Sequence, residues 1–238
     1  MHQRIQLNAD LGEGCGNDQA ILPFIDAANI ACGGHAGDAE SIKNTIIAAK
    51  SCGVKIGAHP SFPDKAGFGR AAMQLNAQQL KDTIHQQLHL ISDIANSLNY
   101  PLNHIKPHGA LYNQAASDHA LANQLAEIFA DFNSELTVIG LAGGELITSA
   151  QKHGLNVMAE GFIDRRYLLN GQLAPRDREG AVIHTIDQAC QQAINIIRSK
   201  PVTTLDGGEV HLQLDTLCLH GDGDQAALLA SSIANLLK

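Results

Sequence analysis

Short apolar segments that end in polar, glycine-rich turns recur along this chain, and they constrain its fold most strongly. The stretch 103–113 begins as an apolar run suited to a strand and passes into a turn that holds Lys106, His108 and Tyr112. The same arrangement recurs at 8–13, 32–38, 57–61, 160–165 and 219–222. Because one polar cluster follows each expected strand, we predict that the clusters meet at one shared site.

Segments with helical periodicity alternate with these expected strands. We predict strands at 4–10, 27–32, 54–58, 103–106, 136–141, 156–159 and 214–219. Helices are expected at 18–25, from Asp38 to Gly53, from Asn76 to Leu98, after Ser117, at 144–153, at 180–199 and at the end of the chain. Asp38, Asn76 and Ser117 are the predicted N-caps, and Gly53 is a predicted helix terminator.

Seven strands that alternate with helices imply a parallel sheet with right-handed crossovers. A doubly wound open sheet gathers reactive residues at one switch point, whereas a barrel delivers every strand end to the same rim. Polar clusters at five or six strand ends favour the barrel. We therefore predict an α/β fold with a single TIM-like (β/α) barrel of seven strands, one short of the usual eight. No low-complexity linker interrupts the chain, so one domain over residues 1–238 is expected.

The charge and composition favour a small-molecule role. The formal net charge is −8 and no Lys/Arg run stands out, which argues against binding to nucleic acid or to an anionic membrane. The N-terminus lacks a signal-peptide core, and no apolar run approaches the length of a membrane span, so we expect a soluble, cytoplasmic protein. Five widely spaced cysteines without a Cys-x-x-Cys pair argue against disulfides or a structural zinc site.

Carboxylates and histidines at the strand ends are the first candidates for chemistry. Asp10 and Glu13 could bind a divalent cation, position a water or act as a base, although Asp, Gly and Glu are also ordinary turn residues. His35 precedes a helix whose N-terminus favours an anion, and it could equally be a buried, hydrogen-bonded histidine. With His59 and His108 it suits either acid–base work or a metal held together with Asp10. Spacing alone does not choose between these roles.

Cationic residues form the second group of candidates. Lys106 is expected in the barrel mouth, acting on a phosphate, a carboxylate or a developing oxyanion, and Tyr112 is either packing or part of the site. Three arginines in an acidic protein suggest an anion receptor around the sixth strand, although some of its charges are expected in structural ion pairs. The charged and polar residues that crowd this strand and its loop are Glu160, Asp164, Arg165, Arg166, Tyr167 and Arg176, and His220 and Asp222 follow the last strand.

Two further observations argue against a His-Glu-x-x-His metal site and against the common nucleotide-binding motifs. His85 and His89 lie four residues apart on an expected helix, but they lack the glutamate of a His-Glu-x-x-His motif, and we interpret them as surface histidines. The chain has no Gly-x-x-x-x-Gly-Lys-Ser/Thr motif, and the glycine turn at 33–37 is not followed by a dinucleotide fingerprint. Any nucleotide must be bound in another way.

The ordered motifs together resemble those of the LamB/YcsF lactam-utilisation family. They span nearly the whole chain, and the one departure is Asn170-Gly171, where Asp-Gly is expected. They are Asn8-x-Asp10-x-Gly12-Glu13, Ala31 to Asp38, Gly57 to Asp64, Gly69-Arg70, Lys106 to Tyr112, Glu160-x-Phe162-x-Asp164-Arg165-x-Tyr167 and His220-Gly221-Asp222.

This resemblance implies a function. Bacterial members form the A component of 5-oxoprolinase, which opens 5-oxoproline to L-glutamate with ATP, in complex with B and C subunits, on a barrel similar to those of glycoside hydrolases and polysaccharide deacetylases. The resemblance leads us to expect ATP as co-substrate, with Mg²⁺. The expected catalytic residues are Asp10 and Glu13 for magnesium or water, Lys106 for the phosphoryl or oxyanion charge, and His59 and His108 for proton transfer. The expected substrate-binding residues, with Arg165 or Arg70 on the carboxylate, are His35, Arg70, Tyr112, Glu160, Asp164, Arg165, Arg176 and His220.

Two alternatives stay open at this point. The chain could be a stand-alone, metal-dependent amide or carbohydrate deacetylase with His35, His59 and Asp10 as ligands. It could also be a subunit that only binds and delivers the lactam, while its partners do the chemistry.

Overall fold

Seven parallel strands form a closed barrel in the computed structural model, which describes residues 4–220 and 225–237. The strand order is β1-β2-β3-β4-β5-β6-β9, and β9 closes the ring by pairing with both β6 and β1. The seven-stranded barrel predicted from the sequence is confirmed. The strands are β1 (Gln6–Leu11), β2 (Ala27–Ala31), β3 (Lys55–His59), β4 (His104–Ile105), β5 (Thr137–Leu141), β6 (Asn156–Phe162) and β9 (Thr216–His220).

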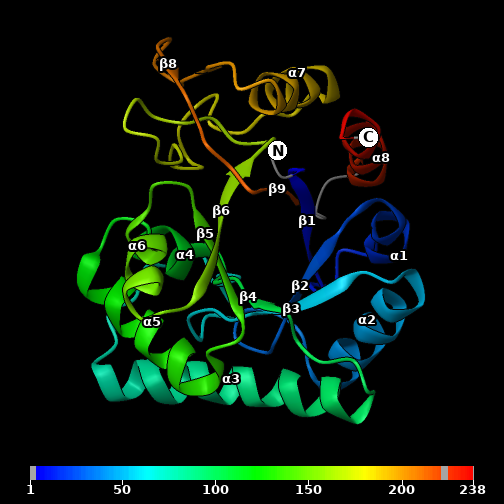
Figure 1. Cartoon of the computed structure of the whole chain (residues 1–238), viewed down its shortest axis with the longest axis vertical. Helices are drawn as coiled ribbons and strands as arrows, with labels where there is room; N and C mark the ends of the chain where they lie inside the picture. Colours follow the sequence, from blue (N-terminus) through cyan, green and yellow to red (C-terminus); the bar gives the residue numbers. More distant parts are fainter. Residues whose placement is uncertain (1–3, 221–224, 238) are drawn as a thin grey trace.

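Helices surround the barrel, and the long α3 lies between α2 and α5 (Figure 1). None of the helices in the described ranges is both long and apolar enough to span a membrane. The helices are α1 (Asp18–Ile21), the 3₁₀ turn η1 (Leu22–Phe24), α2 (Ala39–Cys52), α3 (Ala77–Ser97), α4 (Gly109–Ala115), α5 (His119–Asn133), α6 (Glu145–Lys152), α7 (Ile186–Ile197) and α8 (Ala226–Leu236).

The barrel strands separate an apolar outer face from a polar interior. Successive side chains of a strand point to opposite faces. On β1, Leu7, Ala9 and Leu11 belong to the hydrophobic core that the helices cover, whereas Asn8 and Asp10 hydrogen-bond to residues of other strands. The core therefore lies between barrel and helices, and the barrel interior is left to polar side chains.

Helix caps explain where the predicted helices begin and end. The carboxylate of Asp38 and the amide of Asn76 each form a capping box at the start of α2 and α3. Gly53 ends α2 in the left-handed conformation, with φ of 69°. These three predictions are confirmed.

Two predicted helix starts are wrong. Asp118, not Ser117, caps α5, because its carboxylate accepts hydrogen bonds from two backbone N–H groups of the first turn. The helix expected from residue 180 begins only after Thr185, which caps α7. The preceding residues stay extended because the Ile183 N–H donates to the Asp164 carbonyl.

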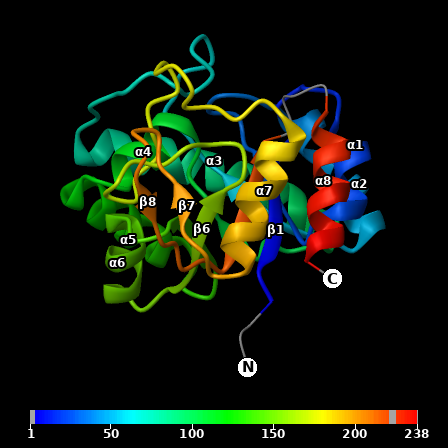
Figure 2. The same cartoon turned by 90° about the horizontal axis from the view of Figure 1, so that it is seen from above.

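One helix and one hairpin were not predicted. Helix α4 begins at Gly109, after the short segment 106–108 that follows β4. Strands β7 (Val202–Thr203) and β8 (Glu209–Val210) form a small antiparallel hairpin (Figure 2). The Leu205 N–H after β7 donates to the Tyr167 carbonyl at 2.8 Å, so the hairpin packs on the long loop that follows β6. This contact supports the loop that carries the arginines.

Candidate functional site

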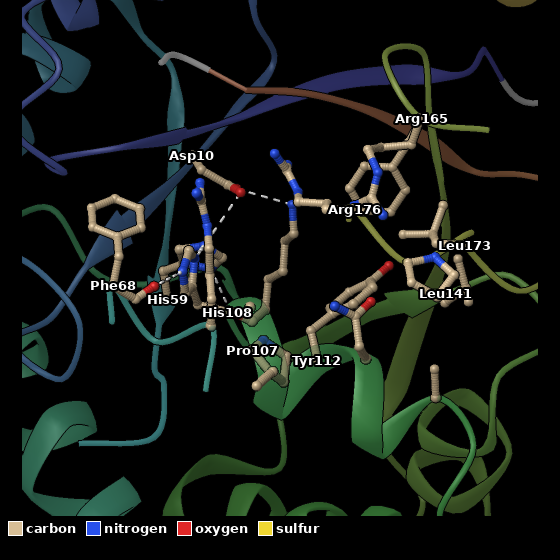
Figure 3. Close-up of a pocket in the computed structure, with 18 of the residues that line it drawn as sticks. Asp10, His59, Phe68, Pro107, His108, Tyr112, Leu141, Arg165, Leu173 and Arg176 are labelled. Carbon is tan, nitrogen blue, oxygen red and sulfur yellow. Dashed lines mark hydrogen bonds and ion pairs between the residues drawn. The ribbon is translucent and has the colours of Figure 1, made fainter. Parts of the chain in front are cut away.

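A cavity of about 420 Å³ opens at the carboxyl ends of the strands (Figure 3). In a parallel barrel these ends all lie on one rim, which is why polar residues far apart in the sequence meet there. The cavity is lined by β1, the segments that follow β3 and β4, α4, and the loop after β6. Nine residues predicted from the sequence line it, namely Asp10, Glu13, His59, Arg70, Lys106, His108, Tyr112, Arg165 and Arg176.

Lys106 lies at the base of the cavity between two carboxylates. Its Nζ is 2.9 Å from Asp10 Oδ1, 2.9 Å from Glu160 Oε1 and 3.0 Å from Cys218 Sγ. Burial opposes the charge, but Asp10, Cys218 and Glu160 outweigh burial and hold the pKa of Lys106 well above its usual value. The lysine is therefore a permanent cation whose charge is already matched inside the protein.

A layer of polar side chains below Lys106 fixes the carboxylates. Asn8 Nδ2 donates to Glu160 Oε1 at 2.9 Å, and Asn29 Nδ2 donates to Asp10 Oδ1 at 2.8 Å. His104 Nε2 lies 2.8 Å from Asn29 Oδ1. Burial, followed by the charge of Lys106, lowers the pKa of His104 to about 3, so this ring is neutral at pH 7.

His59 and His108 meet beside Asp10. Their Nε2 and Nδ1 atoms are 3.0 Å apart, and His59 Nε2 is 3.3 Å from Asp10 Oδ2. The other nitrogen of each ring faces a backbone carbonyl: His59 Nδ1 lies 2.7 Å from that of Lys106, and His108 Nε2 lies 3.0 Å from that of Phe68. Burial, then the neighbouring His59 ring, lowers the pKa of His108.

Glu13 and His35 complete the group of carboxylates and imidazoles at this end of the cavity. His35 Nε2 lies 3.0 Å from Glu13 Oε1, and the same oxygen is 3.3 Å from His108 Nδ1 and 3.9 Å from His59 Nε2. The rings of His35 and His108 stack with their centroids 3.6 Å apart and their planes 2° from parallel. Burial is the main cause that lowers the pKa of His35. Together these residues offer several nitrogen and oxygen atoms to one small volume.

The opposite side of the pocket is cationic, with Arg165 on the wall (Figure 3). The Arg165 side chain is buried, and its Nη2 donates to the Ala174 carbonyl at 2.6 Å. Its Nε is buried without a hydrogen-bond partner among the described residues. Burial, then repulsion by Arg176, lowers the pKa of Arg165 to about 10, with Arg70 adding to the repulsion. An anion bound here would relieve that repulsion.

Two aromatic rings line the cavity beside Lys106. Tyr112 and Phe162 meet edge to face with ring centroids 5.7 Å apart, and Lys106 Nζ lies 6.0 Å and 5.5 Å from these two centroids. Burial and the charge of Glu160 raise the pKa of Tyr112 well above its usual value, so its hydroxyl stays protonated. The wall formed here is apolar, apart from one hydroxyl.

Four predicted site residues do not form the cavity wall. His35 contacts Glu13, and Glu160 contacts Lys106, but neither lines the cavity itself. Asp164 is half-buried in the loop after β6. His220 ends β9, where its backbone pairs with Asp10, but its side chain and Asp222 lie outside the described residues.

Other parts of the site were missed. Asn29 and His104 point into the barrel from apolar runs, and only their alternation within the strands signals it. Phe68 and Leu173 line the cavity from long loops that carry no periodic pattern. Their positions depend on how those loops fold back over the rim.

Comparison with known proteins decides the family. Residues 5–238 match the model of the LamB/YcsF family. The chain belongs to that family. It is 42% identical over 236 residues to the A component of the 5-oxoprolinase of Histophilus somni, covering 99% of this chain and 96% of that protein. It is 45% identical over 238 residues to the corresponding Bordetella pertussis protein, covering 98% and 94%.

A solved structure agrees with this assignment. The lactam utilization protein from Thermus thermophilus matches with a TM-score of 0.91 and 38% identity, over 99% of this chain and 96% of that one. The LamB/YcsF resemblance inferred from the motifs is confirmed. Because the two bacterial relatives are named as one subunit of 5-oxoprolinase, their names imply an enzyme of several subunits.

Proposed function

We propose that this LamB/YcsF chain is the component of an ATP-dependent 5-oxoprolinase that opens 5-oxoproline to L-glutamate, acting with B and C subunits. Relatives named as the A component of 5-oxoprolinase match nearly its whole length and support the proposal. The observation that carries it is the cavity, which joins guanidinium groups to a cluster of carboxylates and imidazoles.

The two ends of the cavity suit the two functional groups of the substrate. 5-Oxoproline has one carboxylate and one lactam. We assign the carboxylate to Arg165 and Arg176, because a planar guanidinium can bind a carboxylate through two parallel hydrogen bonds. Arg70 is exposed at the rim and attracts the anion from solution. The lactam then faces Asp10 and His59.

Ring opening needs an activated amide, because an unstrained five-membered lactam resists water. ATP, with Mg²⁺, is the proposed co-substrate, and its terminal phosphoryl group is transferred to the lactam oxygen. Water adds to the ring carbon, and the carbon–nitrogen bond breaks as the nitrogen takes up a proton. The acyl phosphate formed is then hydrolysed to glutamate and phosphate. Asp10 and Glu13 are the carboxylates at hand to accept the proton of the attacking water.

For Lys106 we propose a different role from the one expected from the motifs. We expected it to hold the phosphoryl or oxyanion charge. Its ammonium group is already 2.9 Å from both Asp10 and Glu160, so little of its charge is left for a ligand. We therefore assign Lys106 to holding the Asp10 carboxylate in position.

The proposal is tested by measuring glutamate release from 5-oxoproline, with and without ATP. The full chain is assayed alone, mixed with its B and C subunits, and with each partner omitted in turn. We expect release only in the complete mixture with ATP. A Glu13→Gln chain in the same mixture is expected to lose most of the activity, while still assembling with its partners.

The two alternatives give different results in this assay. Turnover by B and C subunits without this chain would make it a binding subunit. Hydrolysis of amides or acetylated sugars by this chain alone, without ATP, would make it a stand-alone hydrolase. Either outcome overturns the proposed function.

A further inference from the structure

The hydrogen-bond partners of His59 and His108 decide where their protons lie. A carbonyl oxygen only accepts hydrogen bonds, so a ring nitrogen that faces one at close range must carry the hydrogen. His59 Nδ1 and His108 Nε2 both face carbonyls, at 2.7 Å and 3.0 Å. In the neutral rings, the remaining nitrogens, His59 Nε2 and His108 Nδ1, therefore carry lone pairs.

These two lone pairs point into the same place as two carboxylates. The nitrogens are 3.0 Å apart, Asp10 Oδ2 lies 3.3 Å from His59 Nε2, and Glu13 Oε1 lies 3.3 Å from His108 Nδ1. All four atoms accept hydrogen bonds, and in this arrangement none of them brings a hydrogen to the others. If either ring carried its hydrogen on the other nitrogen, a nitrogen lone pair would face a backbone carbonyl oxygen, and these two acceptors would repel each other. A positive charge at the centre of the cluster would remove the repulsion among its four acceptor atoms.

We propose that Asp10, Glu13, His59 and His108 form a binding site for one divalent transition-metal ion. Donors bound at about 2.1 Å lie about 3.0 Å apart at a right angle, about 3.4 Å apart at a tetrahedral angle and about 4.2 Å apart when opposite. The measured separations, from 3.0 Å between the two rings to 3.9 Å between His59 and Glu13, fall within this range. One ion satisfies all four donors, whereas one proton satisfies only two.

His35 supports this site without being a ligand. A metal lies close to the plane of each imidazole that binds it. The rings of His35 and His108 are parallel and stacked 3.6 Å apart, so no point lies in both planes. His35 instead donates its Nε2–H to Glu13 at 3.0 Å and orients that carboxylate. The carbonyls that accept from His59 and His108 orient these rings in the same manner, which is the usual surrounding of metal-binding histidines.

The donor set selects the kind of ion. Two imidazoles with two carboxylates suit Zn²⁺ and its neighbours in the first transition row, whereas Mg²⁺ and Ca²⁺ prefer oxygen donors alone. Such an ion supplies a Lewis acid that lowers the pKa of a bound water. With this assignment, His59 and His108 hold the ion and do not shuttle protons. The site requires neither the substrate nor ATP to bind its ion.

Direct metal binding to the full chain tests the site. Metal content is measured in the purified protein by mass spectrometry, and chelator-treated protein is then titrated with Zn²⁺ in a calorimeter. We expect about one tight equivalent per chain. His108→Asn and Glu13→Gln are expected to weaken that site at least 100-fold, and His35→Asn by about 10–100-fold.

The matched control is His85→Asn. His85 and His89 stack on one face of α3 beside Phe132 of α5, and two histidines four residues apart could bind Zn²⁺ weakly. The tight site is expected to survive this change. Co²⁺ added to unaltered protein provides a second measurement, because a site with imidazole ligands gives visible absorption bands.

Three results would overturn the proposal. They are no tight Zn²⁺ binding by the unaltered chain, tight binding that is lost in His85→Asn but kept in folded His108→Asn, and a Co²⁺ spectrum identical to that of the hydrated ion. The first result, with activity intact in the oxoprolinase assay, would leave a shared proton between the rings and would not affect the proposed function.

Discussion

At the scale of single residues, the cavity is built from charges that are held in place before any ligand arrives. Arg176 offers the clearest test of the proposed anion-binding end of the cavity. Arg176→Gln removes a charge-assisted contact worth about 1.5–3 kcal/mol, so the KM for 5-oxoproline in the assembled enzyme is expected to rise about 10–100-fold with a smaller change in kcat.

Arg178→Gln is the control for this change. Arg178 lies two residues further along the same loop, but it pairs with Asp206 at the surface, at 2.9 Å. The KM of the Arg178→Gln enzyme for 5-oxoproline is expected to stay near that of the unaltered enzyme. Equal KM values for the two variants would remove Arg176 from the substrate site.

Replacing Lys106 tests how much its positive charge stabilises the two buried carboxylates of the barrel interior. Lys106→Met leaves the Asp10 and Glu160 carboxylates buried without their cation, and it is expected to lower the free energy of unfolding by about 3–5 kcal/mol. Adding Glu160→Gln removes one of the two charges and is expected to restore part of the loss. Urea unfolding of both variants measures the difference, and a double variant no more stable than the single one would contradict this account.

At the scale of helices and strands, room inside the barrel is as important as charge. Gly57 on β3 faces His104 on β4, and a Cβ at Gly57 would overlap the His104 ring. Gly57→Ala is expected to displace that ring and cost about 1–3 kcal/mol, measured by urea unfolding.

Gly140→Ala on β5 is the matched control. The nearest atom to a Cβ there is Ile147 Cδ1 at 3.3 Å, on a flexible side chain that can move slightly. This variant is expected to lose less than about 1 kcal/mol. Similar losses for both variants would mean that the cost belongs to any alanine in a strand and not to His104.

The elements also explain how far the sequence predicts this fold. The barrel strands and most helices follow from local periodicity and caps, as at Asp38 and Asn76. The errors occur where the folded structure, and not the local sequence, determines the residue at which a helix begins. Ser117 and Asp118 are both good N-caps, and only the backbone geometry selects Asp118. The residues before Thr185 have a helical pattern but pair with the loop after β6 instead.

At the scale of the whole molecule, barrel closure turns a list of motifs into a site. Sequence patterns place Asp10, His59 and Lys106 at strand ends, and closure brings these ends together. The patterns do not give the pairing of Lys106 with Glu160, because that contact crosses the barrel interior. Nor do they give ring orientations, which are fixed by carbonyls such as that of Phe68. Most residues that line the cavity were therefore predictable, but their contacts within it required the geometry.

Acid unfolding of the whole chain gives a test of the polar interior. Burial and the charge of Lys106 lower the pKa of His104 from 6.5 to about 3, and His59 and Lys55 add to the effect while Asp10 opposes it. Between these two pKa values the unfolded chain binds a proton that the folded chain does not. His104 therefore makes stability fall as the pH drops from 6.5 towards 3, by up to about 1.4 kcal/mol per pH unit.

His104→Gln is expected to flatten this dependence, because its amide can donate to Asn29 Oδ1 in place of the ring and does not titrate. The free energy of unfolding is measured in urea at intervals from pH 7 to pH 4. His119→Gln is the control, since His119 lies at the surface beside Glu145 and is expected to leave the slope unchanged. If His104→Gln keeps the full slope, the acid sensitivity arises elsewhere in the barrel and the neutral His104 ring is not its source.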